Sequence, residues 1–297
     1  MKNTHDRIRA ILLAFLAAAF YAVNFPFSKL LLKSVAPTMM AALLYLGAGT
    51  GVGILSLFMR KDKRKYERLD KSDLPYVIGM IALDIAAPIL LMIGVRRGTS
   101  ASASLLGNFE IVATTVIALL IFKEAVSKRL WLAIILITLA SAILSFEGAE
   151  SFRLSSGSLF VLLAAICWGF ENNCTRKISA KNTYQIVTLK GLFSGLGALL
   201  IALLLHEPFP GVWQIAAALM LGFVAYGLSI FLYIRAQRTL GAAKTSAYYA
   251  AAPFIGAILS FLILKESLTW LYLVALAVMI AGTLLVVFDT VSRREIQ

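Results

Sequence analysis

The chain has 297 residues, of which 60% are hydrophobic and only 14% are charged, yet its formal net charge is +13. Soluble domains are roughly 45–50% apolar. A soluble protein of this size could not bury so much apolar surface, so lipid must be its solvent. The basic residues lie between apolar runs, without the aromatic-interleaved basic stripe of a nucleic-acid interface. We therefore exclude nucleic acid as a partner and expect a lipid bilayer instead.

The chain is poor in the side chains that catalysis and metal binding use. Its two histidines, His5 and His206, fall outside the apolar runs. This removes Ser-His, Cys-His and His-metal chemistry from the membrane interior. Cys167 and Cys174 are seven residues apart on one helix face, a spacing that neither pairs them nor fits a metal site. We expect reduced cysteines, no metal, no cofactor and no enzymatic activity.

Ten apolar runs occur along the chain, each close to the roughly 20 residues that cross a bilayer as a helix. In chain order they are 8–30, 38–59, 74–95, 100–122, 128–147, 157–176, 184–205, 213–235, 242–264 and 269–289. The first run could instead be a cleaved signal peptide, because basic residues precede it. Its apolar character, however, continues to Leu32, and its end carries Asn24 and Lys29. We therefore predict an all-α integral membrane protein with ten transmembrane helices.

Basic residues are distributed unevenly between the two sides of the predicted membrane. With the N-terminus inside, the inner segments hold 21 of the 28 Lys and Arg residues and the outer loops hold six, while Lys190 lies within the seventh run. Inner loops of membrane proteins are enriched in Lys and Arg. The bias therefore predicts that both termini are cytoplasmic and that the protein lies in the cytoplasmic membrane.

The chain contains an internal repeat of one hydrophobic unit. Lys123-Glu124 and Lys265-Glu266 stand 142 positions apart, and similar apolar sequences precede both. We predict two five-helix repeats, residues 1–148 and 149–297. Because five is an odd number, the second repeat is inverted relative to the first. Two inverted repeats are the architecture of many alternating-access transporters.

The second and seventh runs carry glycines four residues apart. These glycines are Gly47 with Gly51, Gly49 with Gly53, and Gly191 with Gly195. Such spacing lets helix backbones approach closely in lipid, although membrane helices are in any case rich in glycine. We expect close helix packing at these positions.

Short motifs open and close each half of the chain. They are Trp168-Gly169 with Asn172, Tyr21-Ala22 with Asn24, and the acidic turns at Lys123-Glu124 and Lys265-Glu266. With these motifs the chain resembles the EamA-type ten-helix exporters of the drug/metabolite transporter superfamily over nearly its whole length. The resemblance implies a secondary carrier that moves small metabolites, amino acids or drugs, usually outward. It also implies that Glu124 and Glu266 are structural turns or gates. The first half departs from the motif, with Tyr21-Ala22 where the family often has Trp-Gly.

Four ionisable side chains lie well inside the apolar runs. They are Asp84, Glu110, Glu171 and Lys190. A charge at the centre of a membrane helix costs on the order of 2.5–3.5 kcal/mol. The four side chains must therefore face one another, water or a substrate rather than lipid. Three acids and one base leave a local deficit of positive charge.

Glu171 is the strongest candidate for a functional residue. It stands beside Asn172 and Asn173 in an apolar run, and helical spacing places Trp168 and Thr175 on its face. A carboxylate beside an aromatic ring and amides can accept an ammonium group or carry a proton. The alternative is an interhelical hydrogen-bond cluster that only fixes packing.

The remaining ionisable residues have two interpretations each. Glu110 follows Asn108 and either binds substrate or a proton, or only holds two helices together. Asp84 lies one turn before Pro88, which frees a backbone carbonyl that can serve a ligand; the main alternative is a pair with Lys190. Lys190 either neutralises an acid or binds a carboxylate of the substrate.

Three polar residues complete the candidate set. Tyr248 and Tyr249 precede Pro253 in the ninth run and could line a cavity and stack a ligand. Tyrosines near a helix end are more often interface anchors. Asn24 is the counterpart of Glu171 in the predicted repeat, and we include it for that reason.

The sequence favours a secondary transporter that exports a small amino acid-like or cationic compound, or a drug, by alternating access. We expect a cavity built from the first, third, fourth, sixth, eighth and ninth helices, with the fifth and tenth at the periphery. A proton on Glu171 or Glu110 could couple transport, and uncoupled diffusion fits equally. Alternatives are a non-transporting membrane sensor or assembly factor, and a membrane enzyme, for which the acidic segment 70–73 is too sparse. The sequence also leaves a homodimer open.

Overall fold

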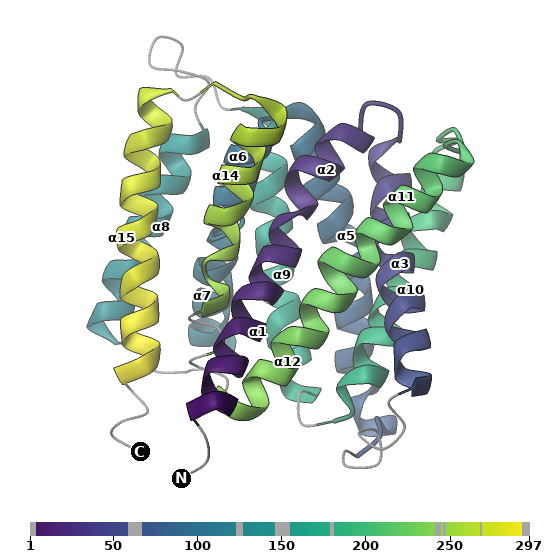
Figure 1. The fold of residues 1–297 in the computed structure, drawn as a ribbon, viewed down its shortest axis with the longest axis horizontal. Helices are drawn as coiled ribbons and strands as arrows, with labels where there is room; N and C mark the ends of the chain where they lie inside the picture. Colours follow the sequence, from purple (N-terminus) through teal and green to yellow (C-terminus); the bar gives the residue numbers. More distant parts are fainter. Residues whose placement is uncertain are drawn as a thin grey trace.

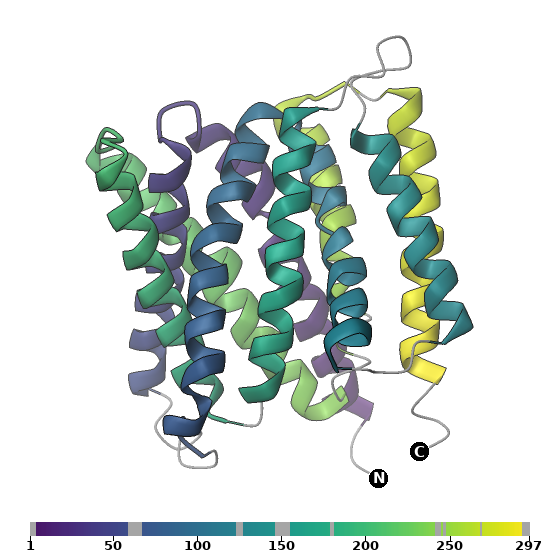
Figure 2. The same cartoon turned by 180° about the vertical axis from the view of Figure 1, so that it is seen from behind.

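The computed structural model describes residues 4–58, 67–122, 127–145, 155–178, 181–240, 245, 248–267 and 269–292, and within these ranges every regular element is a helix. The helices stand side by side as a bundle (Figure 1). The start of α1 (Thr4–Ala22) and the end of α15 (Trp270–Ser292) lie at the same end of the bundle in both views (Figures 1 and 2). We call this end the inner end and the opposite one the outer end.

The helices between α1 and α15 follow the apolar runs. In chain order they are α2 (Asn24–Leu31), α3 (Pro37–Phe58), the short η1 (Lys71–Asp73), α5 (Leu74–Arg97), α6 (Ser100–Leu106), α7 (Phe109–Phe122), α8 (Lys128–Ser145), α9 (Ser156–Ile178), α10 (Thr183–Leu204), α11 (Val212–Gly222), the π-helical turn η2 (Phe223–Leu228), α12 (Ser229–Leu240) and α14 (Ala252–Leu264).

Eight helical segments in the described ranges are long and apolar enough to cross a membrane. The helix α9 is not among these eight segments. It contains the polar run Glu171–Asn173. The helix α14 is described over only 13 residues. The all-helical membrane architecture is therefore confirmed in its coarse form, whereas the count of ten spans and the inverted repeat stay predictions.

Several of the apolar helices are interrupted at mid-length. The first breaks at Val23, and Pro26, which has no N–H to donate, follows in the first turn of α2. The fourth breaks at Gly107 and Asn108, between α6 and α7. The eighth widens into η2, and α14 begins with Pro253 in its first turn. Such breaks at membrane depth are tolerated where they are buried in protein or line a polar cavity.

The helices pack in long pairs. The main contacts include α3 with α10, α5 with α9, α8 with α15, α1 with α12, and α6 with α14. A Cβ atom on Gly49 would lie 2.5 Å from the backbone nitrogen of Leu192, and one on Gly191 would lie 2.4 Å from that of Gly49. Only glycine allows α3 and α10 to approach this closely. The expectation of close packing is confirmed at these two positions.

The helices α8 and α15 stand together at one side of the bundle, as expected for the fifth and tenth apolar runs (Figures 1 and 2). Within the described bundle, α8 and α15 pack chiefly against each other and make few contacts with other helices. Asp84, Glu110, Glu171 and Lys190 all lie on other helices. The candidate site must therefore be sought in the larger group formed by the remaining helices.

Two carboxylates hold helix starts at the outer end. Glu207, just after α10, accepts hydrogen bonds from the backbone nitrogens of Thr38 at 3.3 Å and Met39 at 2.7 Å, at the start of α3. Glu266, just after α14, accepts them from Ser100 at 2.7 Å and Ala101 at 2.9 Å, at the start of α6. A negative charge at a helix N-terminus satisfies orphan N–H groups and complements the helix dipole.

A cation holds the helix end that precedes α6. The Lys29 ammonium donates to the carbonyl oxygens of Val95 at 2.6 Å, Arg96 at 3.0 Å and Gly98 at 2.5 Å. Lys29 and Glu266 therefore bind the two sides of the turn between α5 and α6 with opposite charges. The turn position expected for Glu266 agrees with this contact, and Glu124 lies outside the described residues.

Replacing Glu266 by Ala tests the outer-end contact. The substitution leaves the N–H groups of Ser100 and Ala101 without their acceptor, which costs about 1–3 kcal/mol. We expect a lower unfolding temperature of the detergent-purified protein. The Glu266→Gln variant keeps one acceptor oxygen, so its unfolding temperature should lie between those of the alanine variant and the original chain. An alanine variant as stable as the original chain would contradict the contact.

Candidate functional site

Three ionisable side chains from three helices meet inside the bundle. The Lys190 ammonium on α10 lies 3.0 Å from a carboxylate oxygen of Asp84 on α5 and 3.0 Å from one of Glu171 on α9. The exposed fraction is 0% for Asp84 and 2% for Glu171. Burying such charges is tolerable only when they are paired and hydrogen-bonded. We call Asp84, Lys190 and Glu171 the ion triad.

Two aromatic side chains orient Asp84. Its second carboxylate oxygen accepts hydrogen bonds from the Tyr45 hydroxyl at 2.9 Å and from the Trp168 indole nitrogen at 3.2 Å. Glu171 accepts a hydrogen bond from the Thr175 hydroxyl one turn further along α9. Both carboxylates of the triad are therefore fixed by neutral donors as well as by Lys190.

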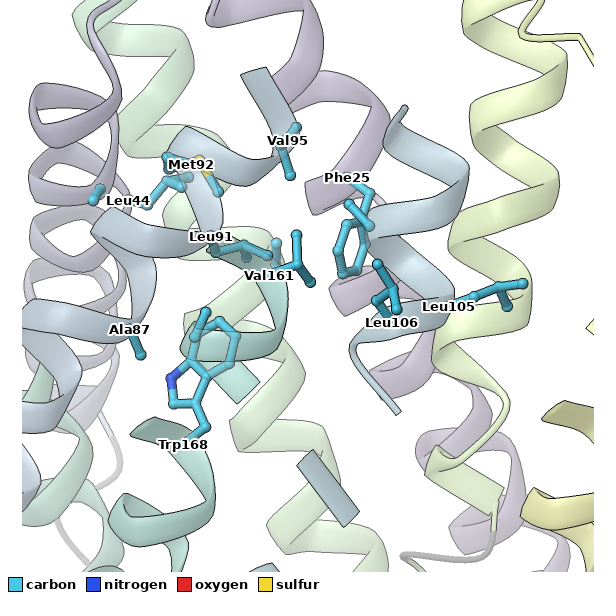
Figure 3. Close-up of a cluster of buried hydrophobic side chains, with 14 of the residues drawn as sticks. Phe25, Leu44, Ala87, Leu91, Met92, Val95, Leu105, Leu106, Val161 and Trp168 are labelled. Carbon is cyan, nitrogen blue, oxygen red and sulfur yellow. The ribbon is translucent and has the colours of Figure 1, made fainter. Parts of the chain in front are cut away.

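Apolar packing fills the bundle on the outer side of the triad. Ala87, Leu91 and Val95 follow Asp84 along α5 and are almost fully buried. Figure 3 shows Leu91 and Val95 above the indole of Trp168, Ala87 to one side of the ring, and Val161 of α9 near Leu91. The triad thus lies at the inner edge of a dry apolar cluster.

A second polar cluster surrounds Glu110. Its carboxylate accepts a hydrogen bond of 2.6 Å from the side-chain amide of Asn172, which also donates to the Thr114 hydroxyl at 3.2 Å. Asn173 donates to the backbone oxygens of Gly169 and Thr114. Glu110 itself is only half-buried. In the described part of the chain, no Lys or Arg lies within ion-pair distance of it.

Asn24 stands at the break between α1 and α2 and is fully buried. Its amide nitrogen donates to the Tyr226 hydroxyl at 3.1 Å, and its oxygen accepts from the Ser28 hydroxyl at 2.9 Å. Tyr226 belongs to η2. The π-helical turn thus brings the Tyr226 hydroxyl to the break between α1 and α2. Such turns recur at functional sites.

Four tyrosine rings, from α1, α3, η2 and the segment just before α14, lie close to one another. The ring centre of Tyr21 lies 5.7 Å from that of Tyr226 and 6.0 Å from that of Tyr249, and Tyr45 lies 5.4 Å from Tyr226. The Tyr249 hydroxyl is 3.1 Å from the Ser229 hydroxyl. We call Tyr21, Tyr226 and Tyr249 the tyrosine cluster.

The structure separates the remaining two candidates from these contacts. The Tyr248 ring packs 5.3 Å from Phe15 of α1, a side chain with 42% exposure. This contact fits the interface-anchor interpretation of Tyr248. Asn108 is 3% exposed, and its amide nitrogen has no hydrogen-bond partner among the described residues.

The candidate site draws on more helices than the sequence indicated. Tyr45 on α3 and Lys190 on α10 bring in the second and seventh helices, which we did not expect to form the cavity. Sequence reasoning also missed Tyr226 and Thr114. A lone tyrosine or threonine in an apolar helix carries no signal, and only its contact with Asn24 or Asn172 reveals its place.

The fold and the site together define a polytopic membrane protein with an ionisable interior. The EamA-like transporter family model matches residues 8–146 and 155–288. The chain belongs to this family and is a membrane transporter rather than an enzyme.

Two further similarities agree with this assignment. A Methanothermobacter thermautotrophicus protein named "Uncharacterized transporter" is 26% identical over 294 residues, covering 92% of this chain and 84% of that protein. A solved structure known as "Crystal structure of protein" is 17% identical with a TM-score of 0.65, covering 96% of this chain and 98% of its own. The latter likeness concerns the fold alone.

The ion triad can be tested through its central cation. Lys190→Met leaves two buried carboxylates without their counter-ion, and breaking a buried pair in this way costs about 3–5 kcal/mol. We expect a marked fall in unfolding temperature. The double variant Asp84→Asn with Lys190→Met should recover part of the loss, because one uncompensated acid is removed. A single variant that is as stable as the original chain would rule out the triad.

Proposed function

We propose that this transporter is a secondary carrier that moves a small cationic or zwitterionic compound, such as an amino acid, out of the cell by alternating access. The observation that carries the proposal is the meeting of three acids and one base inside the bundle. Asp84 and Glu171 both contact Lys190, and Glu110 is an electrostatic neighbour of Glu171 and Lys190. Ionisable groups held within a membrane bundle commonly mark substrate or proton pathways.

The charge balance favours a positively charged cargo group. With every group ionised, the three carboxylates outnumber the one ammonium. A low-dielectric interior penalises this surplus of negative charge. A bound cation or a proton reduces the penalty, whereas an anionic ligand increases it.

Alternating access is supported by the pairing of the helices. The contacts α3–α10, α6–α14 and α8–α15 each join corresponding helices of the two proposed repeats. The contact of α1 with α12 likewise corresponds to that of α9 with α5. Exchanging the halves maps each of these contacts onto itself or onto another of them, as repeats related by a two-fold axis require. The two stretches matched by the family model also support repeats at 1–148 and 149–297.

The proposed orientation has both termini in the cytoplasm and the site in the cytoplasmic membrane. It rests on the 21 basic residues of the inner segments against six in the outer loops. In this orientation Glu207, Glu266 and Lys29 bind helix ends on the extracytoplasmic side.

Flux through liposomes tests the carrier itself. Purified protein reconstituted into vesicles should release radiolabelled amino acids or organic amines faster than empty vesicles, and the rate should saturate with substrate. A thermal-shift screen of metabolites would first select the compounds, because a ligand that binds the folded state raises its stability. Binding without flux of the same compounds would favour a membrane sensor instead.

Glu171→Gln tests whether this residue carries the coupling proton. Glu171 faces Lys190 and Asp84 directly, with Glu110, Tyr45 and Cys174 as electrostatic neighbours. If it exchanges a proton during the cycle, the variant should lose the pH dependence of transport between about pH 5 and pH 8, because glutamine cannot titrate.

The matched control is Glu67→Gln, which removes a carboxylate that is 85% exposed and whose partner among the described residues is Lys181. It should transport as the original chain does at every pH. A Glu171→Gln protein that folds and transports at the original rate across this range would remove the proton role from Glu171.

A further inference from the structure

The interior carboxylates differ in how far the protein already neutralises them. Asp84 and Glu171 share the ammonium of Lys190, and each also accepts a hydrogen bond from a neighbouring side chain. Glu110 accepts only the amide of Asn172 as a direct contact within the described ranges. A neutral amide does not compensate a full charge. Glu110 is therefore the interior carboxylate that still lacks a counter-ion.

Three tyrosines lie within electrostatic reach of this carboxylate. Tyr21, Tyr226 and Tyr249 all have Glu110 as an electrostatic neighbour. These rings come from α1, from η2 and from the segment just before α14, so they approach Glu110 from helices other than its own. Glu110 is thus hydrogen-bonded to α9 and lies within electrostatic reach of tyrosines on other helices.

The hydroxyl groups at the far ends of two rings are already engaged. The Tyr226 hydroxyl accepts a hydrogen bond from Asn24, and the Tyr249 hydroxyl pairs with Ser229. Besides these hydroxyls, the tyrosines offer a ligand the faces of their rings. An ammonium group is attracted to such faces, and more strongly when it is desolvated.

Accessibility also separates Glu110 from the triad. Glu110, Tyr21 and Tyr249 are each half-buried, whereas the carboxylates of the triad are almost completely covered. Binding of a cation to Glu110 thus leaves Lys190 with both of its partners. Reaching Asp84 would require breaking an existing ion pair.

We propose that Glu110 and the tyrosine cluster form the subsite that binds the ammonium group of the cargo, while the ion triad stays closed during binding. The inference rests on the proposed carrier function and deepens it. The class of ligand is a primary or substituted amine with a single positive charge and a small apolar body. The ammonium donates to the Glu110 carboxylate, and the rings of Tyr21, Tyr226 and Tyr249 cover its remaining sides.

Two matched sets of probes test the charge that the subsite selects. Each set holds an amine, an amino acid and a carboxylate with the same body: phenethylamine, phenylalanine and 3-phenylpropionate, or hexylamine, norleucine and hexanoate. Binding to the detergent-purified full chain is measured by calorimetry and by thermal shift. We expect the amines to bind at least tenfold more tightly than the carboxylates. Equal binding across charge, or no amine binding at all, would overturn the proposal.

Glu110→Gln is the decisive variant, because glutamine keeps an oxygen for Asn172 and removes only the charge. It should fold with a similar unfolding temperature and bind the amines at least tenfold more weakly. Tyr249→Phe, which retains the ring, should keep most of the affinity, and Tyr249→Leu should lose it. Glu67→Gln, at an exposed carboxylate, should keep amine binding; a folded Glu171→Gln that loses as much affinity as Glu110→Gln would overturn the assignment.

Flux separates this inference from the proposed carrier function. Saturable flux of an amino acid that Glu110→Gln leaves unchanged would leave the carrier standing and refute the subsite. Amine binding that depends on Glu110, without any flux of the bound compounds, would leave the subsite standing and refute the carrier.

Discussion

The position of Lys190 between two buried carboxylates constrains the rest of the structure. Its ammonium lies 3.0 Å from both Asp84 and Glu171, and the lipid around the bundle offers no water to replace either partner. The three helices α5, α9 and α10 must therefore stay in register. The tight α5–α9 and α3–α10 pairs supply that register. Tyr45 adds a hydrogen bond from α3, so both helices of both pairs contribute to the polar centre.

Breaks in the helices and the polar centre are parts of one arrangement. The break at Val23 leaves Asn24 beside the π-helical turn that holds Tyr226. A continuous α-helix leaves few backbone groups free to contact a ligand. A broken helix frees some of them, at the cost of weaker local hydrogen bonding. On the outer side the packing is different. There, apolar side chains of α5 and charged contacts at the helix ends close the bundle (Figure 3).

The sequence predicts the ionisable residues better than their partners. A charge in a membrane helix is costly wherever it lies, so Asp84, Glu110, Glu171 and Lys190 could each be found from one residue and its apolar flanks. The Asp84–Lys190 pair was among the alternatives, but Glu171 as the second partner was not. Which residues meet depends on the rotation and crossing of helices distant in sequence. The same limit explains Tyr248: adjacent residues point about 100° apart on a helix, and the sequence does not tell which faces inward.

The separation of Glu110 from the ion triad bears on how a proton and a cation could share one carrier. The triad alone carries one surplus negative charge when ionised, and Glu110 adds another. A site closed on both sides must reduce that surplus, because an uncompensated charge in a low-dielectric interior is costly. A proton and a monovalent ammonium each supply one positive charge. Either one can therefore stabilise the closed bundle, and exchange of one for the other at Glu110 needs no change in the pairing of Lys190.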